Sequence, residues 1–173
     1  MRRRSPDVEI ILETDDMLVE IANRLTVIAD SIEAQNPADL HNTKDVLDDS
    51  NREIVQSIIT GYVHECMDIL FPFVKTPVRK CCKKTEYPDE IDKYVIVLSF
   101  NVMRSDTQIH HLQRLIRSYI VYKSCAEWLE MTLPKENIHQ ICENKSQIIR
   151  EQIVTALAVP FNASRIRIKP HWY

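Results

Sequence analysis

Apolar residues recur at intervals of three and four along four stretches of the chain, the spacing that places side chains on one face of an α-helix. These stretches cover about residues 14–34, 49–72, 105–131 and 134–158. The fourth begins at Pro134, because proline is favoured at the start of a helix. Gly61 lies inside the second, where it marks a close helix crossing or a kink. The pattern predicts a mainly α fold with a four-helix bundle-like domain.

Two other stretches have the composition of strands. Residues 94–100 are rich in β-branched and aromatic side chains and predict a strand. Its partner is either residues 74–86 in a long hairpin or the sheet edge of another chain, because a strand is not stable alone. Residues 8–13 form a short strand or lead into the first helix. We therefore expect residues 74–100 to form a long central loop or β-hairpin that protrudes from the helices.

The last thirteen residues, 161–173, predict an extended C-terminal tail. Basic and apolar residues alternate in it before two terminal aromatic residues: Arg165, Ile166, Arg167, Ile168, Lys169, Trp172 and Tyr173. An extended backbone places the three bases on one side and the two isoleucines on the other. Because this C-terminal segment is so apolar, we expect it to dock on its own domain or on a neighbouring protein. The predicted organisation is one helical domain, 1–160, followed by this docking tail.

Charge is distributed unevenly along the chain, although the net charge is only −3. Residues 7–53 contain thirteen acidic and three basic residues, whereas residues 75–84 contain five bases and no acid. Either the acidic half folds onto the basic half of the same chain, or the two halves meet between neighbouring copies. The sequence leaves both arrangements open.

Composition excludes several classes of protein. The chain has one glycine, and it contains no phosphate-binding loop, dinucleotide fingerprint, nucleophile elbow or zinc-protease motif. No run of 18 apolar residues predicts a membrane span. The five cysteines are an odd number without framework spacing, which is typical of reduced thiols in the cytosol. These features predict a protein that is not an enzyme and carries no cofactor or metal.

Two alternative functions remain from the residues alone. A small helical metal-binding or enzymatic protein would use Cys66, His139 and Cys142, because cysteine and histidine are the ligands that zinc prefers. A cytosolic nucleic-acid-associated regulator would use the bases of residues 75–84 to contact phosphates. The acidic net charge argues against a dedicated nucleic-acid binder.

The order of predicted elements is helix, long helix, basic loop with a strand, long helix, helix and extended tail. This layout resembles that of the head–tail connector (adaptor) proteins of tailed bacteriophages. The resemblance covers most of the chain by architecture and rests on no sequence motif. It implies a non-enzymatic subunit of an oligomeric neck ring, placed in the virion after assembly in the host cytoplasm. The acidic N-terminal half has no counterpart in that family.

The resemblance also implies which residues make contacts. In the family, a loop between the central helices packs around a neighbouring subunit, and the C-terminal tail docks on the portal. The loop and strand residues that match are Lys75, Arg79, Lys80, Lys83, Lys84, Tyr94, Val95, Ile96 and Val97. The tail residues that match are those named above. The implied partners are copies of this chain, portal-like and tail-side proteins, and DNA passing through a channel, with no membrane contact.

Overall fold

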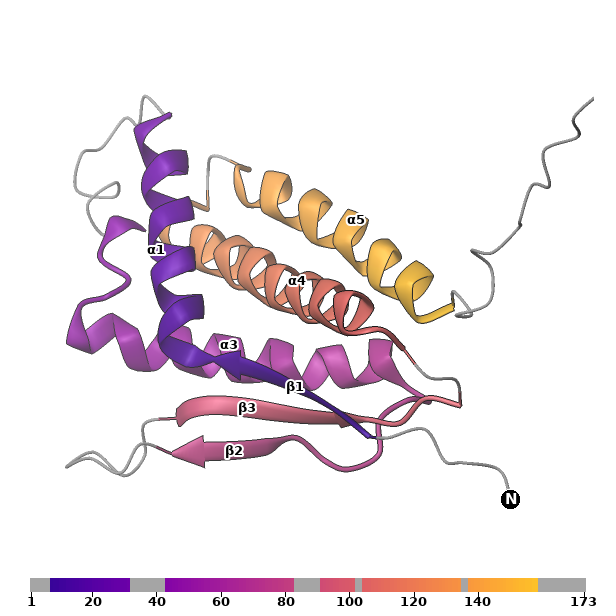
Figure 1. Cartoon of the computed structure of the whole chain (residues 1–173). Coiled ribbons are helices and arrows are strands. Elements are labelled where there is room, and N and C mark those ends of the chain that lie inside the picture. The colour runs from indigo at the N-terminus through magenta and orange to yellow at the C-terminus, as the bar shows by residue number, and fades with distance from the viewer. Residues whose placement is uncertain (1–6, 32–42, 83–90, 102–103, 135–136, 159–173) are drawn as a thin grey trace, which may run out of the picture.

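The computed structural model describes residues 7–31, 43–82, 91–101, 104–134 and 137–158. Within them lie four long helices and three strands (Figure 1). The helices are α1 (Thr14–Asp30), α3 (Asp49–Leu70), α4 (Asp106–Thr132) and α5 (His139–Ala158). The strands are β1 (Val8–Glu13), β2 (Arg79–Cys82) and β3 (Ile91–Leu98). A mostly helical domain is therefore confirmed.

The helix boundaries follow local sequence signals in α4 and depart from them in α5. Ser105 caps α4 in a capping box, in which its hydroxyl accepts from the Gln108 amide and the Gln108 side chain accepts from the Ser105 amide. The prediction that Pro134 begins the fourth helix is wrong, since α5 begins at His139. Asn137 has φ of 49°, in the left-handed region, so a helix cannot run through it from Pro134.

The three strands form one antiparallel sheet in the order β1-β3-β2. The β2–β3 pairing confirms the hairpin alternative for the predicted strand, and the strand alternative for residues 8–13 holds as well. β3 is the central strand, with Ile96 opposite Ile10 on one side and Val95 opposite Arg79 on the other. Both edges of β3 are hydrogen-bonded to strands of its own chain. The alternative prediction, that this strand pairs with the sheet edge of another chain, is therefore wrong.

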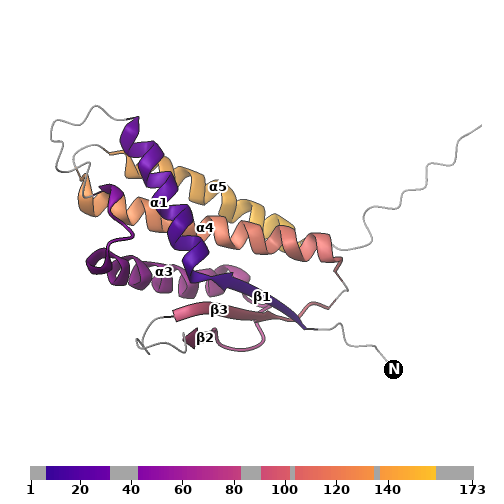
Figure 2. The same cartoon turned by 60° about the vertical axis from the view of Figure 1, so that its left-hand side comes forward.

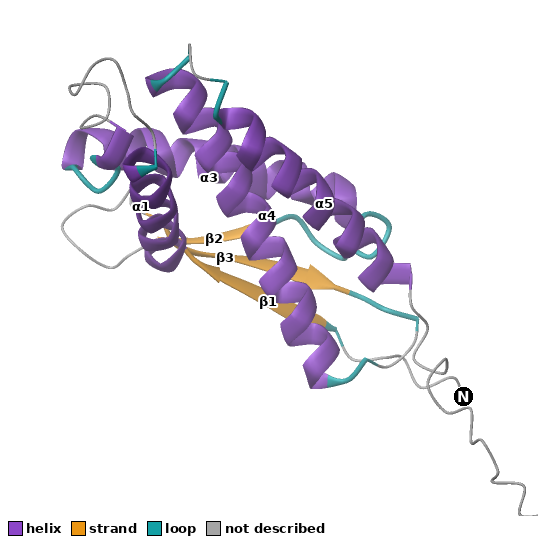
Figure 3. Cartoon of the chain, turned by 90° about the horizontal axis from the view of Figure 1, so that it is seen from above, coloured by secondary structure: helices purple, strands orange, loops and turns teal. Residues whose placement is uncertain are grey.

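The helices lie on one face of the sheet, as Figures 2 and 3 show. α4 is the central helix and packs against α1, α3, α5 and the edge strand β1. Figures 1 and 2 show α1 crossing α4, whereas α5 runs alongside it on the side away from the sheet. The four helices therefore combine with a small sheet, and a four-helix bundle is not confirmed.

The core lies between the sheet and the helices, and two buried tyrosine hydroxyls in it are hydrogen-bonded. Tyr94 of β3 and Tyr119 of α4 are among the largest fully buried side chains. The Tyr94 hydroxyl is 2.7 Å from the Thr60 hydroxyl, and the Tyr119 hydroxyl donates to Glu65 at 2.6 Å. Burial raises the pKa of both phenols, and the two hydrogen bonds fix α3 against β3 and α4.

Gly61 does not mark a close helix crossing. A Cβ added at this position meets no heavy atom within 4 Å, so nothing in the described residues requires a glycine there. We expect Gly61→Ala to raise the free energy of unfolding by about 0.5–1 kcal/mol, because alanine loses less backbone entropy in a helix. Urea denaturation of the two proteins measures the difference. A destabilised Gly61→Ala protein would show that another surface packs closely on α3.

Candidate functional site

Two of the basic residues predicted to contact a neighbouring subunit pair within their own chain. Lys75 forms an ion pair with Asp7, and the Arg79 guanidinium forms one with Glu9 at 2.7 Å. The register places Arg79 beside Val95 and Glu9 beside Val97, so the second pair crosses the central strand. Lys80 lies exposed on β2, and Lys83 and Lys84 lie outside the described residues. Lys75 and Arg79 are already paired with acids of the same chain, so they contribute less to the predicted basic contact surface.

The four strand residues assigned to an inter-subunit contact are buried inside the domain. Tyr94 and Ile96 are fully enclosed in the core between the sheet and the helices. Val95 and Val97, on the other face of the sheet, are 6% and 9% exposed. Their burial corrects that assignment, because these side chains have little surface to offer to a second chain. The unbroken apolar run from Tyr94 to Leu98 was the sequence signal of a strand buried on both faces.

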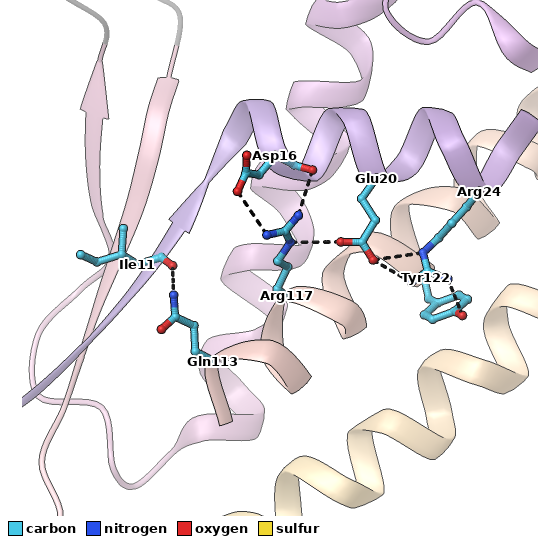
Figure 4. Close-up of polar contacts among 7 residues, drawn as sticks. All are labelled: Ile11, Asp16, Glu20, Arg24, Gln113, Arg117 and Tyr122. Atoms are coloured by element: carbon cyan, nitrogen blue, oxygen red, sulfur yellow. Dashed lines mark hydrogen bonds and ion pairs between the residues drawn. The ribbon is translucent and has the colours of Figure 1, made fainter. Parts of the chain in front are cut away.

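The acidic N-terminal half is joined to α4 by a network of charged side chains, drawn in Figure 4. Arg117 donates to Asp16 at 3.2 Å and to Glu20 at 3.1 Å, so α4 is bound to two acids of α1. Glu20 also accepts from Arg24 at 2.6 Å, and Arg24 donates to the Tyr122 hydroxyl at 2.6 Å.

The charge pairs decide between the two arrangements that the sequence left open for these acids. Asp7, Glu9, Asp16 and Glu20 all pair with bases that lie far along the same chain. Figure 4 also shows Gln113 of α4 donating to the carbonyl oxygen of Ile11, at 2.7 Å, on the edge of β1. For these residues the acidic half folds onto the basic half, and the N-terminal strand and helix are fixed to α4.

The tail residues from Arg165 to Tyr173 lie outside the described residues, but the helix that leads to them has a defined end. Arg104 donates to the carbonyl oxygens of Ala156 and Leu157, both at 2.6 Å, and its guanidinium lies 4.6 Å from the centre of the Phe100 ring. A cation bound to the last carbonyl groups is favoured by the helix dipole. Arg104 thus holds the end of α5 against the start of α4. Sequence reasoning missed it because its partners are 52 and 53 residues away.

An open groove of about 560 Å³ lies beside this contact. Arg104, His111 and Arg114 line it from the region where α4 begins, and Gln152 and Thr155 line it from α5. No carboxylate is among the lining residues. The arrangement suits contact with an acidic or polar surface.

The metal ligands that the sequence suggested are not assembled. Among the described residues, no three histidine, cysteine, aspartate or glutamate side chains gather as a metal site. Cys66 is buried in α3, and burial raises the pKa of its thiol to about 12, which disfavours the thiolate that a metal needs. Cys142 is likewise buried, in α5.

In the described part of the chain, no helix has the length and apolar character needed to cross a bilayer. Comparison of the chain with protein-family models, with curated proteins and with solved structures finds no match.

Proposed function

We propose that this chain is a non-enzymatic assembly subunit, namely a head–tail connector of the neck ring in a tailed bacteriophage. The observation that carries the proposal is the outer face of α5. Ile141 and Ile148 lie seven residues apart on that face and are 59% and 51% exposed. One turn beyond Ile148, Gln152 lines the groove between α4 and α5. The helix thus offers an apolar stripe that continues into a polar groove and leads directly into the tail.

The stripe and the groove suit contact with a neighbouring copy. Exposed apolar side chains that follow one face of a helix are favoured at protein interfaces over the same residues scattered singly. His111 and Arg114 give the groove a basic side, and the exposed carboxylates of Asp48, Asp49 and Glu53 at the start of α3 carry the opposite charge. A contact between two different faces of identical subunits closes into a ring when its rotation permits.

The tail suits a second contact, with a portal-like protein. In an extended segment, Ile166, Ile168 and Trp172 can fill apolar pockets while Arg165, Arg167 and Lys169 pair with acids of the partner. Ordering thirteen residues opposes binding by the loss of their conformational entropy, so the apolar side chains must contribute most of the affinity. The clamp of Arg104 on the end of α5 sets the position from which the tail begins.

Light scattering of the purified chain tests the ring. We expect a particle larger than a tetramer, alone or with the portal protein of a tailed bacteriophage. Exchange of Ile141 and Ile148 for serine should reduce the particle to monomers, because the apolar stripe is lost. The matched control is Val27→Ser, which removes an apolar side chain of α1 that is 69% exposed, more than either isoleucine. A full-length chain that stays monomeric with and without the portal protein contradicts the proposal.

Removal of residues 161–173 tests the tail separately. We expect the shortened chain to keep its fold and its self-association and to lose binding to the portal protein, at least 100-fold, in a pull-down titration. Exchange of Ile166 and Ile168 for serine should reproduce most of that loss, whereas Arg165→Ala should cost much less, because exposed ion pairs contribute little. Unchanged portal binding without the tail would contradict this part of the proposal.

A further inference from the structure

The groove between α4 and α5, which run alongside each other in Figure 1, is lined by side chains that can donate hydrogen bonds. Arg104, His111 and Arg114 are basic, and no carboxylate is among the described residues that line it. Asp106 and Glu151 are acids nearby in the sequence, but both are exposed and lie outside the lining. The groove is therefore positively charged, and its volume of about 560 Å³ is that of a small-molecule site.

Two local hydrogen bonds determine which atoms of the lining act as donors. The side-chain oxygen of Gln108 accepts from the Ser105 amide, so the amide nitrogen of that side chain is left as a donor. The Arg114 guanidinium lies 3.3 Å from His111 Nδ1, and because arginine can only donate, Nδ1 is the acceptor. The proton of the neutral His111 ring then lies on Nε2, which is a second donor.

Arg104 is held in place by its own fold. Its Nη1 donates to the carbonyl oxygen of Ala156 and its Nη2 to that of Leu157, both at 2.6 Å, and the guanidinium lies 4.6 Å from the centre of the Phe100 ring. These bonds neutralise two carbonyl groups at the end of α5, and a guanidinium carries five N–H groups, so Arg104 can donate further. An arginine that is already ordered loses little conformational entropy when a ligand binds to it.

We propose that this groove binds a terminal phosphate group, with Arg104, His111 and Arg114 donating to its oxygens. A terminal phosphate has three free oxygens that point in different directions, whereas a carboxylate has two oxygens in one plane. The three donors lie along more than two turns of chain, and Gln152 can donate from α5 on the opposite side of the groove. Donors placed on two helices suit the three oxygens of a phosphate better than the two of a carboxylate.

The phosphate site does not rest on the proposed function, because a single copy of the chain presents the whole groove. The acids of a neighbouring copy would compete with the phosphate for the same bases, so only one of the two can occupy the groove at a time. Terminal phosphates occur in small molecules such as pyrophosphate and on phosphorylated serine side chains. The backbone phosphates of a nucleic acid lack the third free oxygen, and we expect them to bind more weakly.

Isothermal titration calorimetry of the full-length chain with pyrophosphate tests the site. The buffer contains no phosphate and about 0.15 M salt, which screens charges more than about 8 Å apart. We expect Arg114→Gln to weaken the binding about 10-fold, because one charged donor is lost. Arg150→Gln is the matched control. It removes the same charge from an exposed position of α5 that does not line the groove, and should change the affinity by no more than about twofold.

Nuclear magnetic resonance of the unsubstituted chain locates the bound phosphate even where a variant fails to fold. Pyrophosphate should shift the amide signals of Gln108, His111 and Gln152, whereas the signal of Lys80 on β2 should stay in place. The same titration with a phosphoserine peptide identifies the source of the phosphate, since the natural ligand is of the class that binds more tightly.

Four results would overturn the proposal. Pyrophosphate does not bind or leaves the groove signals unshifted; Arg114→Gln and Arg150→Gln weaken its binding equally; a chain without residues 161–173, which include the bases of the tail, no longer binds it; or a single-stranded oligonucleotide binds the groove more tightly than pyrophosphate does.

Discussion

Replacement of Trp128 by alanine is expected to lower the free energy of unfolding by about 4 kcal/mol. Trp128 of α4 is 4% exposed, and its indole N–H donates to the carbonyl oxygen of Thr43 at 3.1 Å. The Thr43 hydroxyl donates in turn to Thr132 at 3.1 Å, and Val46 is fully buried nearby in sequence. Trp128 therefore attaches residues 43–46, which precede α3, to the end of α4. Alanine would leave a cavity and an unpaired carbonyl group.

The conservative change Trp128→Phe separates packing from hydrogen bonding. It keeps most of the ring and removes only the N–H group, so the expected loss is about 1–2 kcal/mol. Urea denaturation followed by far-ultraviolet circular dichroism measures both proteins, because the signal does not depend on tryptophan. Equal losses for phenylalanine and alanine would mean that the hydrogen bond, and not the packing, holds residues 43–46.

Replacement of Ile96 by alanine is expected to lower the free energy of unfolding by about 3 kcal/mol. Ile96 is fully buried at the middle of β3, opposite Ile10 of β1. The cavity left by alanine would lie under the helices, where the closely packed surroundings relax only partly. The same urea denaturation measures the loss, and the mass of the particle by light scattering should not change.

Lys80→Ala is the control for this prediction. Lys80 lies on the neighbouring strand β2 and is exposed, so its removal should change stability by no more than about 0.5 kcal/mol. If Ile96→Ala left stability unchanged and dissociated the particle, β3 would be an inter-subunit strand and the position of this strand in the core would be refuted.

The helices were predictable because each carries its own signal. The apolar spacing of three and four residues is local, and so is the capping box of Ser105 and Gln108 that begins α4. The start of α5 was misplaced because Pro134 has two local meanings. It begins a helix in some contexts and follows the end of one in others, and here it comes two residues after α4 ends at Thr132.

The contacts of the candidate site were not predictable, because they depend on which distant residues the fold brings together. The basic character of Lys75 and Arg79 was visible, but their pairing with Asp7 and Glu9 follows from the register of two strand pairs. The clamp of Arg104 on the end of α5 likewise joins residues about fifty positions apart.

The cysteines illustrate the same limit. Cys66, His139 and Cys142 were candidates for a shared ligand site by residue type, whereas among the described residues no such group of three is assembled. A helix repeat shows which residues share a face, but it does not show what the face meets. Only the packing of α5 on α4 supplies that information.

The order of strands in the sheet also has a consequence for the way the chain is made. Glu13 pairs with Lys93 and Val8 with Leu98, so the N-terminal strand has no partner until the ribosome has synthesised the residues of β3. β2 and β3 are closer in sequence and can pair first, since short loops close at the least entropic cost. β1 therefore cannot take its place in the sheet until β3 has been synthesised, and until then its apolar residues lack their partners on that strand.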